Sequence, residues 1–167
     1  MKNLYILISV LLFVSFWIND RLICQQVQPP VIENPLDIRK EMIAEAEKYV
    51  GKRYKSRVGK QIMDCSGYTK MCMQKFGFII TRSSVTQIHE GVRVKEIMKA
   101  RPGDIIVFKG SNARNRRPGH VGLVHHISND TLYFIHSSVS KGITIDHLHQ
   151  SYYKRRFLQI RDVIGDK

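Results

Sequence analysis

The hydrophobic positions in the first part of the chain recur with a helical spacing, whereas those in the second half do not. Over residues 37–50, Ile38, Met42, Ala46 and Tyr49 fall on one helical face. The second half contains short β-branched or aromatic runs, which predict strands over residues 104–108, 121–127, 132–136, 143–145 and 157–163. Helices followed by neighbouring strands predict an α+β fold with an antiparallel sheet.

Further helices are expected between these parts. The segment Tyr68 to Phe76 follows Asp64, which is a good N-cap, so that Cys65 would lie in the first helical turn. Ser83 and Ser84 are suitable caps for a short helix that reaches Glu90. Residues 52–60 are predicted to form a basic loop.

The N-terminal residues follow a different pattern. Lys2 precedes an apolar run from Leu4 to Ile18, which is shorter than the roughly 20 residues of a membrane span and matches the core of a secretory signal. We predict a signal peptide or signal-anchor over residues 1–24, a Pro-containing linker over residues 25–36 and one folded domain over residues 37–167. We therefore expect an exported protein of the periplasm, cell envelope or extracellular space, with membrane attachment through this segment if it is retained.

Composition and charge limit the classes of molecule that this protein is expected to bind. Hydrophobic residues make up 43% of the chain, which excludes a disordered protein. The formal net charge is +13, which favours an anionic partner such as nucleic acid, a lipid surface or an acidic polymer. Because the predicted secretory signal would direct the protein out of the cytoplasm, where nucleic acid is found, we expect no nucleic-acid partner.

The chain has 3 cysteines, and they do not predict a disulfide framework. Cys65 and Cys72 on one helix would be roughly 10 Å apart along its axis, beyond the reach of a disulfide. Cys24 would be lipidated only after small residues, and Arg21, Leu22 and Ile23 precede it. Cys72, which lies between methionines, is expected in the core, so Cys65 is the thiol with polar neighbours.

A thiol with two histidines is the arrangement that a cysteine hydrolase needs. His120 begins one predicted strand and His136 ends the next. The helix N-terminus and a histidine are expected to lower the pKa of Cys65. A hairpin loop at residues 128–130 would place both histidines on one face of the sheet, whereas a loop one residue shorter would separate them.

Zinc binding is another use that a cysteine and two histidines can serve. Cys65, His120 and His136 form a set that zinc would accept, but C-x-x-C and H-E-x-x-H spacings are missing from the chain. We therefore expect no metal or other cofactor. The remaining histidines are expected at the surface or in packing roles: His89, His125, His126, His147 and His149.

Several short blocks surround the candidate residues. They are Asp64-Cys65-Ser66-Gly67-Tyr68, Thr81-Arg82-Ser83-Ser84 with Gln87 and Gly91, Arg101-Pro102-Gly103-Asp104-Ile105 with Phe108, Gly119-His120-Val121-Gly122-Leu123, and Ile135-His136-Ser137-Ser138 followed by Gly142-Ile143. In this order, over about residues 40–163, the blocks resemble the NlpC-type cysteine peptidases, bacterial cell-wall hydrolases with a papain-like core.

The resemblance implies roles for individual residues. Cys65 would be the nucleophile, His120 the general base and then acid, and His136 the residue that orients His120. Tyr54 matches a tyrosine near the family's active site, and Ser66 and Arg82 are implied as substrate contacts. The sequence departs from the family at Lys55–Gly59, where a Gly-Gly pair is usual, and in the basic loop Lys109–Pro118.

The resemblance also implies a substrate. The scissile bond would be the γ-D-glutamyl to diamino-acid amide (diaminopimelate or lysine) in peptidoglycan stem peptides. Two alternatives remain at this stage. One is cleavage of the muramyl–L-alanine amide by a related thiol fold, and the other is an inactive module that binds the cell wall or another polyanion.

Overall fold

The computed structural model describes residues 35–165. The helices are α2 (Pro35–Glu47), α3 (Cys65–Lys75), α4 (Ser84–Gln87) and α5 (Ser151–Lys154), with a 3-10 turn η1 (Ile97–Lys99). The strands are β1 (Arg57–Val58), β2 (Gln61–Ile62), β3 (Val92–Val94), β4 (Ile105–Lys109), β5 (Pro118–Ser128), β6 (Thr131–Ser138), β7 (Gly142–His147) and β8 (Phe157–Asp162). The predicted signal segment, Cys24 and nearly all of the predicted linker lie outside the described residues.

Strands β3 to β8 form a six-stranded antiparallel sheet in the order β3-β8-β4-β5-β6-β7, as expected for an α+β fold. Each strand predicted from the sequence is present. The sequence did not predict β3, which is short and pairs only with β8. It also did not predict the β1–β2 hairpin, whose first strand lies within the expected loop over residues 52–60 and whose second strand follows that loop.

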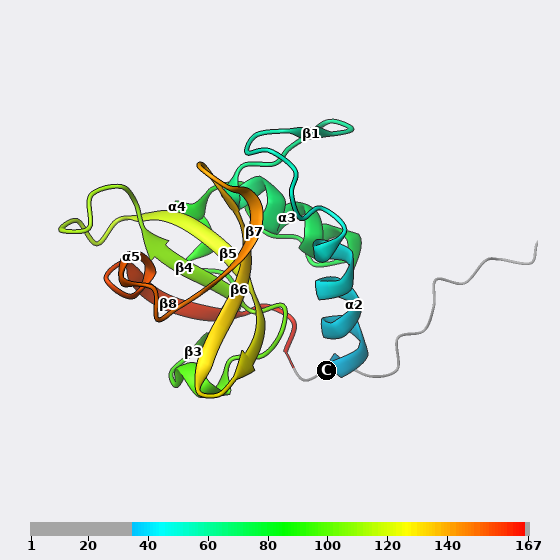
Figure 1. The fold of residues 1–167 in the computed structure, drawn as a ribbon. Coiled ribbons are helices and arrows are strands. Elements are labelled where there is room, and N and C mark those ends of the chain that lie inside the picture. Colours follow the sequence, from blue (N-terminus) through cyan, green and yellow to red (C-terminus); the bar gives the residue numbers. More distant parts are fainter. Residues whose placement is uncertain (1–34, 166–167) are drawn as a thin grey trace, which may run out of the picture. The chain divides into compact units, whose positions relative to one another are not determined.

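The sheet is covered on both faces, and α2 and α3 lie next to each other on one of them (Figure 1). Val121 and Ile135 pack with Tyr68 and Cys72 on the helical face. A second cluster, which includes Phe108, Phe134 and Tyr153, covers the other face. Because the central strands are buried on both faces, they read in the sequence as continuous apolar runs. The free Cys72 thiol is in the core, as predicted.

Helix α3 begins at Cys65 because Asp64 caps it. The Asp64 carboxylate accepts a hydrogen bond from the Gly67 backbone N–H at 2.8 Å, which satisfies one of the free N–H groups of the first turn. The helix ends at Lys75, and Gly77 takes a left-handed conformation just beyond it. The expectation that Cys65 lies in the first turn is confirmed. Ser83 likewise caps α4, which ends at Gln87, before the expected Glu90.

The β5–β6 hairpin differs from the expected one in two ways that cancel. Its loop is one residue shorter than expected, because Ser128 pairs with Thr131 and only Asn129 and Asp130 turn the chain, both with positive φ. A β-bulge between Val124 and His126 adds one residue to β5 and restores the expected register, in which Leu123 pairs with Ile135. The predicted three-residue loop was wrong, but His120 and His136 still lie on the same face of the sheet, as that loop implied.

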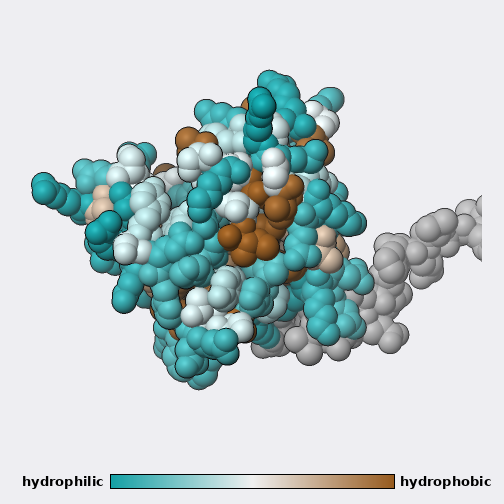
Figure 2. Space-filling model, in the orientation of Figure 1, coloured by the Kyte–Doolittle hydropathy of each residue, from teal (hydrophilic) through white to brown (hydrophobic). Residues whose placement is uncertain are grey.

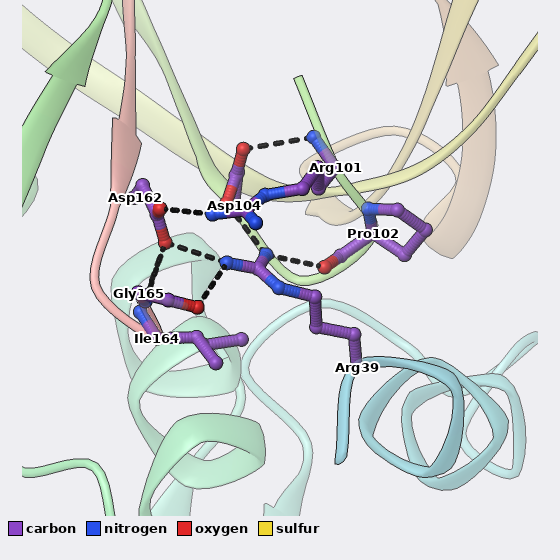
Figure 3. A network of polar contacts seen from close by, with 7 residues as sticks. All are labelled: Arg39, Arg101, Pro102, Asp104, Asp162, Ile164 and Gly165. Carbon is purple, nitrogen blue, oxygen red and sulfur yellow. Dashed lines mark hydrogen bonds and ion pairs between the residues drawn. The ribbon is translucent and has the colours of Figure 1, made fainter. Parts of the chain in front are cut away.

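A buried ion-pair network ties α2 to the ends of two strands (Figure 3). The Arg39 side chain is 1% exposed, and its guanidinium donates to the Asp104 carboxylate at 2.8 Å and the Asp162 carboxylate at 2.7 Å. It also donates to the Pro102 carbonyl at 2.9 Å. Arg101 pairs with the other oxygen of Asp162 at 2.5 Å. This network fixes the first described helix against β4 and β8.

The visible face in Figure 2 is mostly hydrophilic, with one hydrophobic patch near its centre. This agrees with the high charge content of the chain, 25% Asp, Glu, Lys and Arg. Among residues 35–165, no helix combines the length and the apolar character that a membrane span requires.

Candidate active site

Cys65 lies where the start of α3 meets the start of β5. The side chain is buried, and the backbone N–H groups of Val121 and Ser66 are near enough to the sulfur to favour its thiolate form. Burial raises the pKa of the Cys65 thiol, and the Asp64 carboxylate adds to that rise. The sequence had predicted a lowered pKa. Backbone N–H groups do favour the thiolate here, as expected from the helix N-terminus, but the loss of solvent outweighs them.

His120 and His136 form the hydrogen-bonded pair that the sequence predicted. The His120 Nε2 and His136 Nδ1 atoms are 2.8 Å apart, and the two rings are nearly perpendicular, at 89°. Burial lowers the pKa of His120 to about 3, with the His136 ring as the second cause, and burial also lowers the pKa of His136. Both rings are therefore neutral at pH 7.

Gly122 allows this pairing. A Cβ atom at residue 122 would lie 2.8 Å from the His136 Cβ and 2.7 Å from the Ile135 carbonyl oxygen. A side chain there would push β5 away from β6, because contacts this short are repulsive. The glycine therefore lets the two strands approach closely where the histidines meet.

The thiol and His120 are brought together through adjacent residues of β5. His120 directly precedes Val121, whose backbone N–H acts on the Cys65 thiol by favouring its charged form. Within the described part of the chain, no hydrogen bond joins that sulfur to the His120 ring. At rest the thiol and the imidazole are therefore both neutral and do not form a preformed ion pair.

We expect the alkylation rate of Cys65 by iodoacetamide to reflect this resting state. Only the thiolate reacts, so the rate is expected to rise about tenfold per pH unit from pH 6 through about pH 8.5, the ordinary pKa of a cysteine. The measurement is mass-spectrometric quantification of the modified Cys65 peptide. Cys72 is an internal control, because burial raises its pKa to about 12. A rate that is flat across neutral pH would contradict the prediction and indicate a preformed thiolate.

Asp146 and Tyr153 complete a polar cluster that the sequence did not predict. Asp146 Oδ2 is 3.1 Å from His136 Nε2 and accepts from the Tyr153 hydroxyl at 3.0 Å. The hydrogen bond from His136 is the main cause that holds the pKa of Asp146 well below its usual range. A signal did exist, because Asp146 directly follows the predicted strand 143–145, opposite the strand that ends at His136. The pairing of Phe134 with Asp146 makes Asp146 a diagonal neighbour of His136.

The predicted substrate contacts lie around Cys65. Tyr54 is half-buried, and burial, followed by the nearby Cys65 and Asp64, raises its pKa. Arg82 forms a bidentate pair with Asp64, both bonds at 2.8 Å, and donates to the Ser66 hydroxyl at 2.9 Å. Ser66 is buried. Ser66 and Arg82 therefore support the cap of α3, and substrate contact by these residues and by Tyr54 remains a prediction.

A cavity of about 320 Å³ opens beside the histidines. Besides His120 and His136, its lining includes Ser138, Lys141, Gln150, Tyr152 and Tyr153. Across residues 35–165, no group of three or more Cys, His, Asp or Glu side chains is arranged to hold a metal ion.

The other histidines lie apart from this cluster. The His125 Nε2 atom is 2.7 Å from Glu47 Oε1, and the exposed His126 ring stacks on Tyr133. His89 and His149 are exposed, and His147 is half-buried. These positions agree with the surface and packing roles that were expected.

Comparison with known proteins adds independent evidence. A family model described as the NlpC/P60 family matches residues 49–162. The Escherichia coli (strain K12) protein named Murein DD-endopeptidase MepS/Murein LD-carboxypeptidase is 31% identical over 135 residues, which are 78% of this chain and 65% of that protein. The Listeria monocytogenes protein named Probable endopeptidase p60 is 32% identical over 111 residues, 66% of this chain and 21% of that protein. The chain thus spans less than two thirds of the length of either relative.

The fold has counterparts among solved structures. The peptidoglycan hydrolase RipB from Mycobacterium tuberculosis matches with a TM-score of 0.59 and 19% sequence identity, over 83% of this chain and 69% of that chain. At that identity the likeness concerns the fold alone, and it agrees with the papain-like α+β architecture described above. The extent of the family match and the identity to the Escherichia coli protein together show that the chain belongs to the NlpC/P60 family.

Proposed function

We propose that the protein is an exported cysteine peptidase that hydrolyses peptidoglycan stem peptides at the γ-D-glutamyl to diamino-acid amide bond. One observation carries the proposal. The Cys65 thiol at the N-terminus of α3 lies beside Val121 of β5, and the preceding residue of that strand, His120, is hydrogen-bonded to His136. The printed names of the relatives, a murein endopeptidase and a probable endopeptidase, support the substrate class.

The proposed reaction is acyl transfer through the Cys65 sulfur. Because thiol and imidazole are both neutral at rest, the proton moves from the sulfur to His120 as the sulfur attacks the carbonyl carbon. The N–H groups at the N-terminus of α3 stabilise the oxyanion. His120 then returns the proton to the leaving amine, and water hydrolyses the thioester with His120 as the base.

Basic side chains support an acidic peptide as the substrate. The Arg114, Arg116 and Arg117 side chains are exposed in the loop between β4 and β5, which leads directly to His120. Stem peptides carry free carboxylates, so positive charge beside the site attracts them at low ionic strength. Lys141 lines the cavity beside the histidines, where its charge is paired with the Asp146 carboxylate.

The test is digestion of purified cell wall, followed by mass spectrometry of the released fragments. The wild-type chain is compared with Cys65→Ala, which removes the nucleophile and leaves the backbone of α3 unchanged. We expect the wild type to release fragments with a new γ-D-glutamyl carboxylate, and Cys65→Ala to release none. Equal release by both proteins would exclude the thiol mechanism.

The same spectra separate the alternative bonds. A new carboxylate on muramic acid would indicate an amidase. A new D-alanine carboxylate at the cross-link would indicate cleavage of a D,D bond, which the name of the Escherichia coli relative favours. Binding to the wall with no released fragment would indicate an inactive binding module. Each of these results would replace the proposed bond.

A further inference from the structure

Asp146 receives more hydrogen bonds than a surface carboxylate would, and the proposed mechanism does not use it. Besides His136 and Tyr153 at Oδ2, it accepts from Lys141 Nζ at 2.8 Å and Gln150 Nε2 at 2.9 Å, both at Oδ1. The residue is 5% exposed. Its four partners come from β6, from the turn that follows β6 and from the segment that forms α5.

These contacts restrict the protons of the neighbouring rings. The low pKa of Asp146 keeps the group a carboxylate, which can only accept. The His136 Nε2 atom that faces it must therefore carry a proton. In a neutral ring the other nitrogen, Nδ1, is then bare, and it must accept from His120 Nε2, 2.8 Å away. His120 in turn keeps its proton on Nε2 and leaves Nδ1 bare.

We propose that Asp146 is a positioning residue that sets the tautomers of both histidines, so that Nδ1 of His120 is the nitrogen that receives the thiol proton. This inference rests on the proposed function. Tyr153 assists, because its hydroxyl donates to the same carboxylate oxygen that His136 contacts. The opposite tautomer of His136 would point a lone pair at the carboxylate and would leave His120 with its Nδ1 protonated.

The surroundings keep this arrangement in place. The ring of His136 is 5.0 Å from Phe134 and 5.4 Å from Tyr153, measured between centroids. The His120 ring lies 6.0 Å from Phe108. The Tyr153 hydroxyl is also 3.2 Å from His136 Nε2. Because that hydroxyl donates to the Asp146 carboxylate, the proton between His136 Nε2 and Asp146 must come from the ring. The only other charged group at the carboxylate among the described residues is Lys141.

The first test is nitrogen-15 NMR of the histidines in the wild-type chain at pH 7, without substrate. The two nitrogens of a neutral ring have distinct shifts, so the spectrum identifies which one carries the proton. We expect Nε2–H in both His136 and His120. A proton on Nδ1 of His136 would overturn the proposal, and this result depends on no variant and on no enzymatic activity.

The second test is Asp146→Asn, with Glu96→Gln as the matched control. The asparagine must direct its NH₂ group either at His136 and Tyr153 or at Lys141 and Gln150. The asparagine therefore cannot accept hydrogen bonds from both pairs of donors, as the carboxylate does. If its NH₂ group faces His136 Nε2, that nitrogen must accept, and the tautomers of both histidines are reversed. We expect kcat for stem-peptide hydrolysis to fall by at least about tenfold while KM changes less than about twofold. Glu96→Gln removes the same charge from an exposed carboxylate, and we expect wild-type kinetics.

The two readouts distinguish failure of this inference from failure of the proposed function. Unchanged kcat in folded Asp146→Asn, with His136 still protonated on Nε2, would overturn the inference. The predicted tautomers in a wild-type chain that releases no wall fragments would refute the proposed function and leave the tautomer assignment intact. If Asp146→Asn does not fold, the wild-type spectrum still decides, and Tyr153→Phe, which removes one donor, is expected to give a smaller fall in kcat.

Discussion

Replacement of His120 with asparagine is expected to lower kcat for stem-peptide hydrolysis by about 10²–10⁴-fold, the usual contribution of a general acid–base residue. Asparagine is polar and smaller, so it can occupy the site, but it cannot accept the thiol proton. The loss is expected mainly in kcat, because the imidazole acts on the reacting atoms rather than in holding the substrate. The measurement is the initial rate of fragment release from purified wall peptides at pH 7.

The matched control is His126→Asn, the same substitution on the same strand. His126 is exposed and lies beyond the bulge of β5, where it stacks on Tyr133. Its replacement is expected to leave kcat within about twofold of the wild type, as for most surface substitutions. Equal losses in both variants would mean that the effect comes from strand stability, and a normal rate in His120→Asn would remove His120 from the mechanism.

Replacement of Arg39 with methionine is expected to lower the free energy of unfolding by about 3–5 kcal/mol, the range for removing one partner of a buried ion pair. Methionine fills much of the same volume but leaves the fully buried Asp104 without its cation. It also removes the hydrogen bonds that hold α2 to the segment before β4 and to the end of β8 (Figure 3). The measurement is urea unfolding of the two proteins, monitored by circular dichroism.

Lys99→Met is the control for loss of one positive charge. Lys99 pairs with Glu96, but their side chains are 72% and 64% exposed, so the pair is worth less than about 1 kcal/mol. If Arg39→Met changed stability no more than Lys99→Met, the buried network would not hold the fold together. Asp104 would then have to be satisfied by the Arg101 backbone N–H, which donates to it at 2.8 Å.

The position of Cys65 in the first turn of a capped helix could be predicted from local patterns, because it depends on near neighbours. Asp64 caps the helix three residues before Gly67, and that contact exists in any chain with this sequence and a helix here. The histidine pair depended on strand register, which was harder to predict. The loop of the β5–β6 hairpin is shorter than expected, and the bulge of β5 compensates for it. No short-range pattern distinguishes this bulge from a regular strand, because it satisfies packing on both sheet faces.

The role of Asp146 and the pKa of Cys65 could not be predicted from near neighbours in the sequence. Asp146 reaches His136 only because β7 pairs with β6, and α5 brings Tyr153 to the same oxygen. The thiol pKa was expected to fall at a helix N-terminus, yet burial between α3 and β5 raises it. The first result depends on which strands pair, and the second depends on how much water remains around the thiol once distant segments pack. A short sequence pattern records neither.

The order of elements, the polar cap before Cys65 and the identity of the histidines follow from the amino-acid order, because periodicity and capping involve residues a few positions apart. The proton positions of the histidines, the carboxylate behind them and the resting charge of the thiol arise from packing of segments far apart in the chain. Hydrogen-bond geometry and desolvation set these properties, and both exist only after β5, β6 and β7 have paired and α3 and α5 have packed against them.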